Sequence, residues 1–137
     1  MPFPMPRLDP VTIARFDPVR VRRLLQDPGI VRHRGKIEAT VVNARAVLAV
    51  RRKHGSFARW IWSFVGGHPI QTRPRTRRDV PAETETSRLM SRELRRRGFT
   101  FVGPTIVYSF LQAVGVVDDH FVGCPFKREG TRARRPV

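Results

Sequence analysis

The clearest hydrophobic pattern in the first half of the chain lies between residues 34 and 52. Four apolar residues recur there at spacings of four, three and four: Ile37, Val41, Ala44 and Leu48. An α-helix repeats every 3.6 residues, so this spacing places the four side chains on one side of a helix. The pattern predicts a long helix over about 34–52, with one stripe facing the core, that ends at His54-Gly55.

A second hydrophobic pattern, near the C-terminus, predicts the most clearly defined helix. Five apolar residues fall at positions i, i+1, i+4, i+5 and i+8: Ile106, Val107, Phe110, Leu111 and Val114. The opposite side carries polar residues: Thr105, Ser109 and Gln112. Pro104 stands where the first helical residue falls, and Gly115 closes the helix. We therefore predict a helix over 104–115 that presents one continuous apolar face.

Start and stop signals place the shorter helices. Asp-Pro pairs occur at 9–10, 17–18 and 27–28. An aspartate accepts the free amides of a first helical turn, and the following proline has no amide to leave unpaired. The first two pairs predict helices that end near residues 15 and 26, and the third predicts a turn. Ser56 is expected to cap a helix that continues to residue 64, and Thr86 or Ser87 to begin one that ends at Gly98.

The remaining segments complete an all-α prediction. Residues 69–78 contain two prolines, four arginines and no periodicity, which predicts an exposed loop. No alternating pattern is long enough for a sheet. A chain of 137 residues suits a single domain with a modest core, which we assign to residues 1–124. The basic residues 125–137 are expected to form a disordered tail.

The charge balance points to a partner. The chain has 27 Lys and Arg against 11 Asp and Glu, a formal charge of +16. Such an excess of positive charge favours a partner with a phosphate backbone, and we predict that this partner is double-stranded DNA. The alternative is that 24 Arg against 3 Lys reflects genome base composition and mostly a solvated face. One cysteine excludes an intramolecular disulfide, and no apolar run reaches the ~18 residues of a membrane span. A cytoplasmic protein without membrane association is expected.

The segment from residue 88 to residue 115 has the order helix, GFTFVG turn, helix. In a helix-hairpin-helix, placed here at about 87–115, the turn amides and the following helix N-terminus converge on a point that suits a DNA phosphate. The candidate DNA-binding residues are Arg97, Gly98, Phe99, Phe101, Gly103 and Thr105, with Arg34 and Lys36 from a second basic cluster. Such contacts position a protein on DNA without reading its sequence. Spacing alone fits an ordinary helical hairpin equally well.

His120 and Cys124 form a possible metal-binding pair. A spacing of four residues can bring an imidazole and a thiolate to one metal ion if the chain between them turns. Two side chains do not complete a structural zinc site, which takes four ligands. The pair alone is therefore a weak signal.

Three stretches of the sequence resemble the DNA-3-methyladenine glycosylase I family. They are LLQDPGIVRHRGKIEATVVNARA at 24–46, WSFV at 62–65 and RGFTFVGPTIVYSFLQAVGVVDDHFVGC at 97–124. They follow the order found in the family, and the match runs from about residue 8 to residue 124. The resemblance implies an all-α helix-hairpin-helix enzyme of base-excision repair, which hydrolyses the N-glycosidic bond of N3-methylated adenine in alkylated DNA.

The resemblance also implies groups that this sequence lacks. In the family, the counterparts of His120 and Cys124 hold structural zinc with a Cys and a His near the N-terminus. The same N-terminal segment supplies an acidic residue and aromatic rings that bind the methylated base. This chain is expected to be truncated there, so its zinc site would be half present. Ser109 is the one candidate pocket residue, and no catalytic residue is identified.

Two functions follow from this expectation. The first is an active glycosylase, whose N-terminal segment comes from an upstream start or from a separate polypeptide. The second is a non-enzymatic remnant that binds DNA through its hairpin, with self-association covering exposed apolar side chains. An RNA-associated basic protein would explain the charge but not the hairpin.

Overall fold

The computed structural model of the chain describes residues 9–29 and 33–127. The helices are α1 (Pro10–Ala14), α2 (Pro18–Leu25), α3 (Arg34–His54), α4 (Phe57–Ser63), α5 (Glu85–Arg96) and α6 (Pro104–Ala113). The other elements are a 3-10 turn, η1 (Arg77–Asp79), and the strands β1 (Ile70–Gln71) and β2 (Val117–Asp118). The predicted all-α class is confirmed, since each strand is only two residues long.

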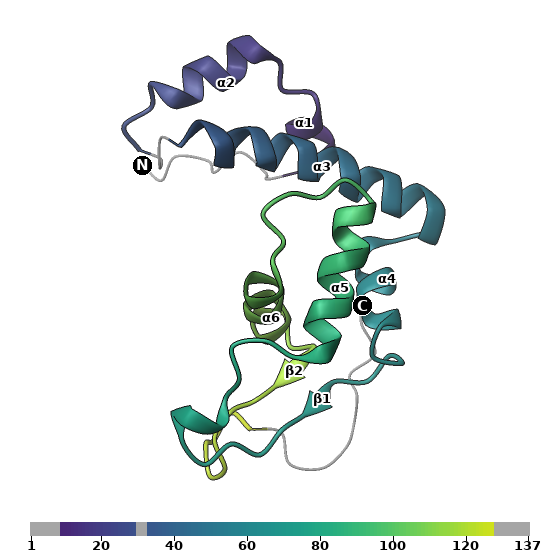
Figure 1. The fold of residues 1–137 in the computed structure, drawn as a ribbon. Helices are drawn as coiled ribbons and strands as arrows, with labels where there is room; N and C mark the ends of the chain where they lie inside the picture. The colour runs from purple at the N-terminus through teal and green to yellow at the C-terminus, as the bar shows by residue number, and fades with distance from the viewer. Residues whose placement is uncertain (1–8, 30–32, 128–137) are drawn as a thin grey trace.

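The long helix α3 organises the molecule (Figure 1). Helices α1 and α2 pack against α3 and form an arm along its N-terminal half. Helix α4 packs against α3 as well. Helix α5 extends away from α3 with α6 packed against it, and the strand pair lies at the end of α5 that is remote from α3. The C-terminal end of α5, and the turn that follows it, therefore lie beside α3.

Side-chain caps start the N-terminal helices as the sequence predicts. The Asp9 carboxylate accepts from the Val11 amide at 3.0 Å, and the Asp17 carboxylate from the Arg20 amide at 2.8 Å. Asp27 accepts from the Gly29 amide at 2.8 Å, which makes the expected turn. Each aspartate satisfies an amide that has no partner in its own helix or turn.

Helix α5 begins earlier than predicted. Its N-cap is Thr84, not Thr86 or Ser87, and its first helical residue is Glu85. The Thr84 hydroxyl accepts from the Ser87 amide at 3.2 Å, and the Ser87 hydroxyl accepts from the Thr84 amide at 2.8 Å. This reciprocal capping box satisfies two amides at once, an advantage that a cap at Thr86 does not offer.

The prediction of a continuous exposed loop over 69–78 is wrong in part. Ile70 pairs in parallel with Val117, and Gln71 with Asp118. Pro74 is buried, and η1 begins at Arg77. The four arginines of the segment are exposed as expected. A two-residue strand carries no detectable period, so the pattern of the sequence could not reveal it.

The core lies between the C-terminal half of α3 and helices α4, α5 and α6. Its most deeply buried side chains are Val50, Met90, Tyr108, Leu111 and Val116. The Tyr108 hydroxyl donates to the Asp119 carboxylate at 2.8 Å. Burial, with the bond to Asp119 and that carboxylate's charge, raises the pKa of Tyr108 above its usual range. This pair ties α6 to the segment after β2.

None of the described helices combines the length and the apolar character that crossing a lipid bilayer requires. Residues 128–137 of the predicted tail lie outside the described residues. Within the described part of the tail, the Lys127 ammonium donates to the Thr72 carbonyl.

Candidate nucleic-acid interface

The turn between α5 and α6, residues 97–103, is called the hairpin below. Gly98 has φ +89°, a conformation that side chains disfavour. Its amide donates to the Arg95 carbonyl at 3.0 Å, and the Phe99 amide donates to the Leu94 carbonyl at 3.1 Å. These two bonds form a Schellman motif that closes α5 and places the Phe99 ring in the core. The predicted role of Gly98 as a helix terminator is confirmed.

Asn43, in the middle of α3, fixes the next residue of the hairpin. Its amide nitrogen donates to the Thr100 carbonyl at 2.9 Å, and its carbonyl oxygen accepts from the Thr100 amide at 2.8 Å. The buried Ser91 of α5 donates its hydroxyl proton to the Val102 carbonyl. The backbone is thus held on both sides of Phe101.

Phe101 occupies a strained conformation between these two anchors. Its φ of +55° makes it the one non-glycine residue with positive φ in the described ranges 9–29 and 33–127. Such a conformation costs of order 1–3 kcal/mol and persists where the surroundings impose it. Phe101 is 54% exposed, and its ring lies close to α3, since a Cβ on Gly35 would stand 3.9 Å from its Cζ.

Gly103 precedes α6 without any internal need for glycine. Its φ is −59°, and a Cβ there would meet nothing nearer than the Arg95 guanidinium, at 4.0 Å. Gly103 is the N-cap of α6 and makes no side-chain cap, and Thr105 in the first turn is exposed. The N-terminus of α6 is therefore open to an anion, with the Arg95 guanidinium beside it.

The predicted basic residues have different surroundings. Arg34 and Lys36 are exposed on the first turn of α3. The Arg97 guanidinium instead lies over the Trp60 ring, 4.9 Å from its centroid. Burial, and then the charges of Arg97 and Lys53, lower the pKa of His54 beside this pair. The structure brings Arg97 to the core edge of the hairpin, and its contact with DNA stays a prediction.

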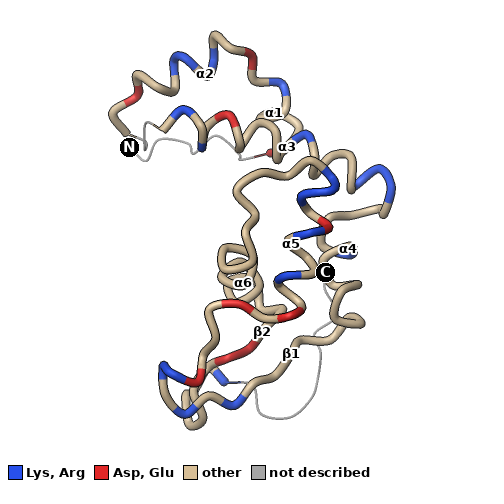
Figure 2. Tube along the Cα trace, viewed as in Figure 1, with Lys and Arg blue, Asp and Glu red and all other residues tan. Residues whose placement is uncertain are grey.

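Basic side chains dominate the outer surface near these elements. Figure 2 shows Lys and Arg along α2, at both ends of α3 and along α5, with few Asp and Glu between them. The exposed Arg96 pairs with Glu93 at 3.0 Å, whereas Arg92 and Arg95 make no ion pair within the described part of the chain. Guanidinium groups without an ion pair remain able to donate hydrogen bonds to phosphate oxygens.

The predicted continuous apolar face of α6 is divided in the structure. Val107, Tyr108 and Leu111 are buried against the core. Three apolar residues stay exposed: Ile106 by 56%, Phe110 by 37% and Val114 by 48%. The buried face therefore includes Tyr108, which the apolar pattern left out, and its hydroxyl donates to the Asp119 carboxylate. Exposed apolar residues at i, i+4 and i+8 form a second, uncovered stripe.

Ser109 lies on the exposed surface of α6. Its hydroxyl donates to the Thr105 carbonyl one turn earlier, at 3.2 Å. The hydroxyl oxygen can still accept a hydrogen bond from a ligand. A role in a base pocket stays a prediction.

His120 and Cys124 follow β2 and line a common hollow. The His120 Nδ1 lies 2.7 Å from the Asp118 carboxylate, so Nε2 is the ring nitrogen left for a metal. Cys124 carries a free, half-buried thiol. No group of three or more His, Cys, Asp or Glu residues able to hold a metal occurs among the described residues. The donors present here do not complete a zinc site.

These features define an all-α domain with a glycine-containing turn between two helices on a basic surface. The family model described as methyladenine glycosylase matches residues 5–128. The chain therefore belongs to the methyladenine glycosylase family.

Two relatives show how much of a family member the chain represents. The DNA-3-methyladenine glycosylase 1 of Escherichia coli K12 is 48% identical over 118 residues, which make up 86% of this chain and 63% of that protein. The DNA-3-methyladenine glycosylase of Haemophilus influenzae is 42% identical over 121 residues, 88% of this chain and 65% of the relative. The chain thus spans less than two thirds of each relative's length.

Solved structures of similar proteins share the fold. A crystal structure of 3-methyladenine DNA glycosylase I superposes with a TM-score of 0.84 at 48% identity, covering 88% of this chain and 66% of the other. A substituted 3-methyladenine DNA glycosylase I in complex with 3-methyladenine superposes with a TM-score of 0.87 at 35% identity, covering 90% and 66%. The arrangement of the described helices is therefore that of the family.

Proposed function

We propose that this chain carries the DNA-binding part of a DNA-3-methyladenine glycosylase, which excises N3-methylated adenine from alkylated DNA. The reaction hydrolyses the N-glycosidic bond and opens base-excision repair in the cytoplasm. The observation that carries the proposal is the family match over residues 5–128, joined with 48% identity to the Escherichia coli glycosylase.

In this proposal, the helix-hairpin-helix formed by α5, the hairpin and α6 binds the backbone of duplex DNA. The Schellman turn at Gly98 and the bonds from Asn43 give the hairpin one conformation before DNA arrives. Gly103 leaves room for a phosphate at the N-terminus of α6, and the Arg95 guanidinium stands beside it. Because these groups address phosphates, binding would be independent of sequence.

The chemistry expected of the enzyme requires little from acid–base groups. N3-methylation gives adenine a positive charge, which already weakens its bond to deoxyribose. The enzyme has to extrude the nucleotide, select the base by shape and edge, and admit water to the sugar. Among the residues of this chain, Ser109 is the candidate contact with the base. The carboxylate and the aromatic rings that bind it are expected in the third of the relatives that this chain does not span.

Zinc would join the C-terminal part of this chain to that remaining third. His120 and Cys124 would supply two ligands, with Asp118 holding the imidazole so that Nε2 is free. We expect the 137-residue chain alone to hold no stoichiometric zinc, since two donors leave half of a tetrahedral site to water. Elemental analysis after dialysis checks this expectation, and one tightly held zinc per chain would contradict it.

A second function is favoured by the share of the relatives that the chain covers, 63% and 65%. A chain that lacked the base-binding residues and found no partner to supply them would bind DNA without releasing a base. The hairpin would then position this protein on duplex DNA and do nothing further.

A base-release assay on alkylated DNA separates the two functions. We expect the 137-residue chain alone to release 3-methyladenine no faster than spontaneous depurination. Adding the unmatched third of the Escherichia coli relative, as a fused segment, should restore release. Rapid release by the 137 residues alone, lost on substitution of Ser109, would overturn the DNA-binding-only alternative. An inactive fused protein that still binds duplex DNA would instead overturn the glycosylase proposal.

A further inference from the structure

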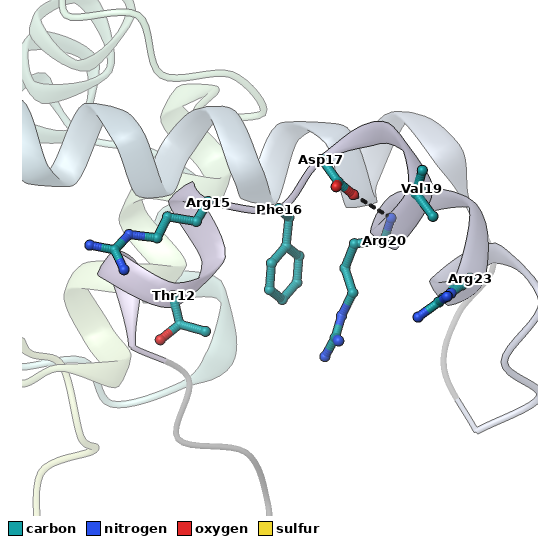
Figure 3. A pocket seen from close by; sticks show the side chains of 7 residues that line it. All are labelled: Thr12, Arg15, Phe16, Asp17, Val19, Arg20 and Arg23. Carbon is teal, nitrogen blue, oxygen red and sulfur yellow. Dashed lines mark hydrogen bonds between the residues drawn. The ribbon is translucent and has the colours of Figure 1, made fainter.

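A hollow beside the connection between α1 and α2 gathers three arginines, and it is called the arginine pocket below. Its lining includes Thr12, Arg15, Phe16, Asp17, Arg20 and Arg23, around a volume of about 510 Å³. Figure 3 shows the Phe16 and Arg20 side chains side by side, with Arg23 pointing toward them and Arg15 extending away on the far side of Phe16. This arm is separate from the hairpin, which joins α5 to α6.

The charges in the arginine pocket are not balanced from within the chain. Asp17 is the one acidic residue in its lining, and its carboxylate caps α2 by accepting from the Arg20 amide at 2.8 Å. Over residues 9–29 and 33–127, none of the three arginines makes an ion pair. Like charges repel, so three guanidinium groups that line one hollow destabilise each other, and an anionic ligand would offset that cost.

The pocket is held in place before any ligand binds. The Arg20 guanidinium lies over the Phe16 ring, 5.1 Å from its centroid. This stacking restricts the arginine and leaves the edge of its planar donor group to a ligand. The Arg45 guanidinium of α3 donates to the Ala14 carbonyl at 3.0 Å, which fixes the end of α1 beside the pocket.

The shape and the surroundings favour one kind of ligand. The pocket is a surface hollow rather than an enclosed cavity, so it suits a phosphate that projects from a polymer. The aliphatic residues of α2 other than Val19 are half-buried, namely Val21, Leu24 and Leu25. A lipid surface would require an uncovered apolar stripe on this helix, and α2 offers only the 47% exposed Val19.

We propose that the arginine pocket is a second phosphate-binding site for DNA, which extends the footprint of the chain beyond the hairpin. Arg15, Arg20 and Arg23 bind phosphodiester oxygens, and the Thr12 hydroxyl adds a donor. The site rests on the proposed DNA-binding function and enlarges it, because it binds phosphates that neither the hairpin nor α6 reaches.

The test measures duplex affinity of the 137-residue chain as a function of salt. Replacing Arg15, Arg20 and Arg23 with Gln should reduce the magnitude of the logarithmic salt slope by about 0.9 for each phosphate that is no longer neutralised. The matched control replaces three exposed arginines of the segment between β1 and α5, Arg73, Arg75 and Arg78, which lie outside the proposed interface, and should leave the slope nearly unchanged. An equal reduction in both variants, or none in either, would overturn the proposal.

Two further variants guard against a general effect of charge or folding. Arg20→Lys keeps the charge but removes the planar fork, and Phe16→Leu removes the ring under it. Both should weaken binding, with a helical circular-dichroism spectrum like that of the parent. Normal affinity in both would contradict the stacked geometry. Binding of the chain to anionic phosphatidylserine vesicles, abolished in the triple variant while duplex binding stays intact, would identify a membrane site and overturn the DNA assignment.

Failure of the arginine-pocket proposal can be told apart from failure of the proposed glycosylase function. If the triple variant has a smaller salt slope and the fused enzyme releases no base, the pocket binds DNA in a protein that is not a glycosylase. If the fused enzyme releases the base and the triple variant binds like the parent, the enzyme stands and the pocket does not.

Discussion

Asn43 joins two parts of the chain that are 57 residues apart, through both polar atoms of its side chain. At the scale of single residues, these two hydrogen bonds hold the hairpin against α3. Thr100 is exposed, so water can take the place of the asparagine when that side chain is removed. The two bonds therefore contribute more to the geometry of the hairpin than to the stability of the fold.

We predict that Asn43→Leu lowers the free energy of unfolding by only about 1 kcal/mol. Duplex affinity should fall by about three- to tenfold, because Phe101 is then free to leave its strained conformation before DNA arrives. Thermal unfolding and fluorescence anisotropy on one duplex measure the two effects. Thr40→Ala, which removes a bond within α3 only, is the matched control and should change neither quantity strongly.

Sequence reasoning found the glycines of the hairpin but not the asparagine that holds it. Gly98 and Gly103 stand out because each lies next to a predicted helix end, where glycine is a recognised boundary signal. Asn43 lies inside a helix, where no local rule marks it, and its partner is distant in sequence. Ser91 escaped for the same reason, since a buried serine in α5 resembles any small helix residue until Val102 is placed beside it.

At the scale of elements, the sequence predicted α3 and α6 almost to the residue. The boundaries of these helices are set by local residues that can be recognised in the sequence: a proline, a glycine or a capping side chain. The face that α6 buries could not be predicted, because all five apolar positions satisfy the helical period. How α6 packs against α5 and β2 decides which of them reach the core, and the sequence alone does not show that packing. The strand pair was missed because four residues carry no period.

The uncovered stripe of α6 gives a testable expectation. Ile106, Phe110 and Val114 should bind an apolar fluorescent dye and promote association of the 137-residue chain, since monomers rarely expose such contiguous patches. Replacing all three with Gln should reduce dye binding and concentration-dependent association without lowering the melting temperature. Unchanged dye binding in that variant, or a parent chain that stays monomeric and binds no dye, would contradict this expectation.

At the scale of the whole molecule, charge and fold point to the same surface. Lys and Arg occur along α2, at both ends of α3 and along α5, and the hairpin lies beside the middle of α3. The charge of the chain favours nucleic acid as a partner, and the order of helix, turn and helix predicts the surface that would bind it; both stay predictions. The arginine pocket was missed, since Arg15, Arg20 and Arg23 line one hollow only after α1 and α2 are placed.

The most direct test of the DNA-binding account is the affinity of a Gly103→Val variant for duplex DNA. The fold accepts a side chain at Gly103, because φ is −59° and the nearest atom would lie 4.0 Å from the new Cβ. A phosphate bound at the N-terminus of α6 would clash with that side chain. We predict a melting temperature close to that of the parent, with weaker binding on every duplex sequence and a smaller salt slope. Gly98→Val, at φ +89°, should instead lower the melting temperature. Binding by Gly103→Val with the parent's affinity and salt slope would contradict the account.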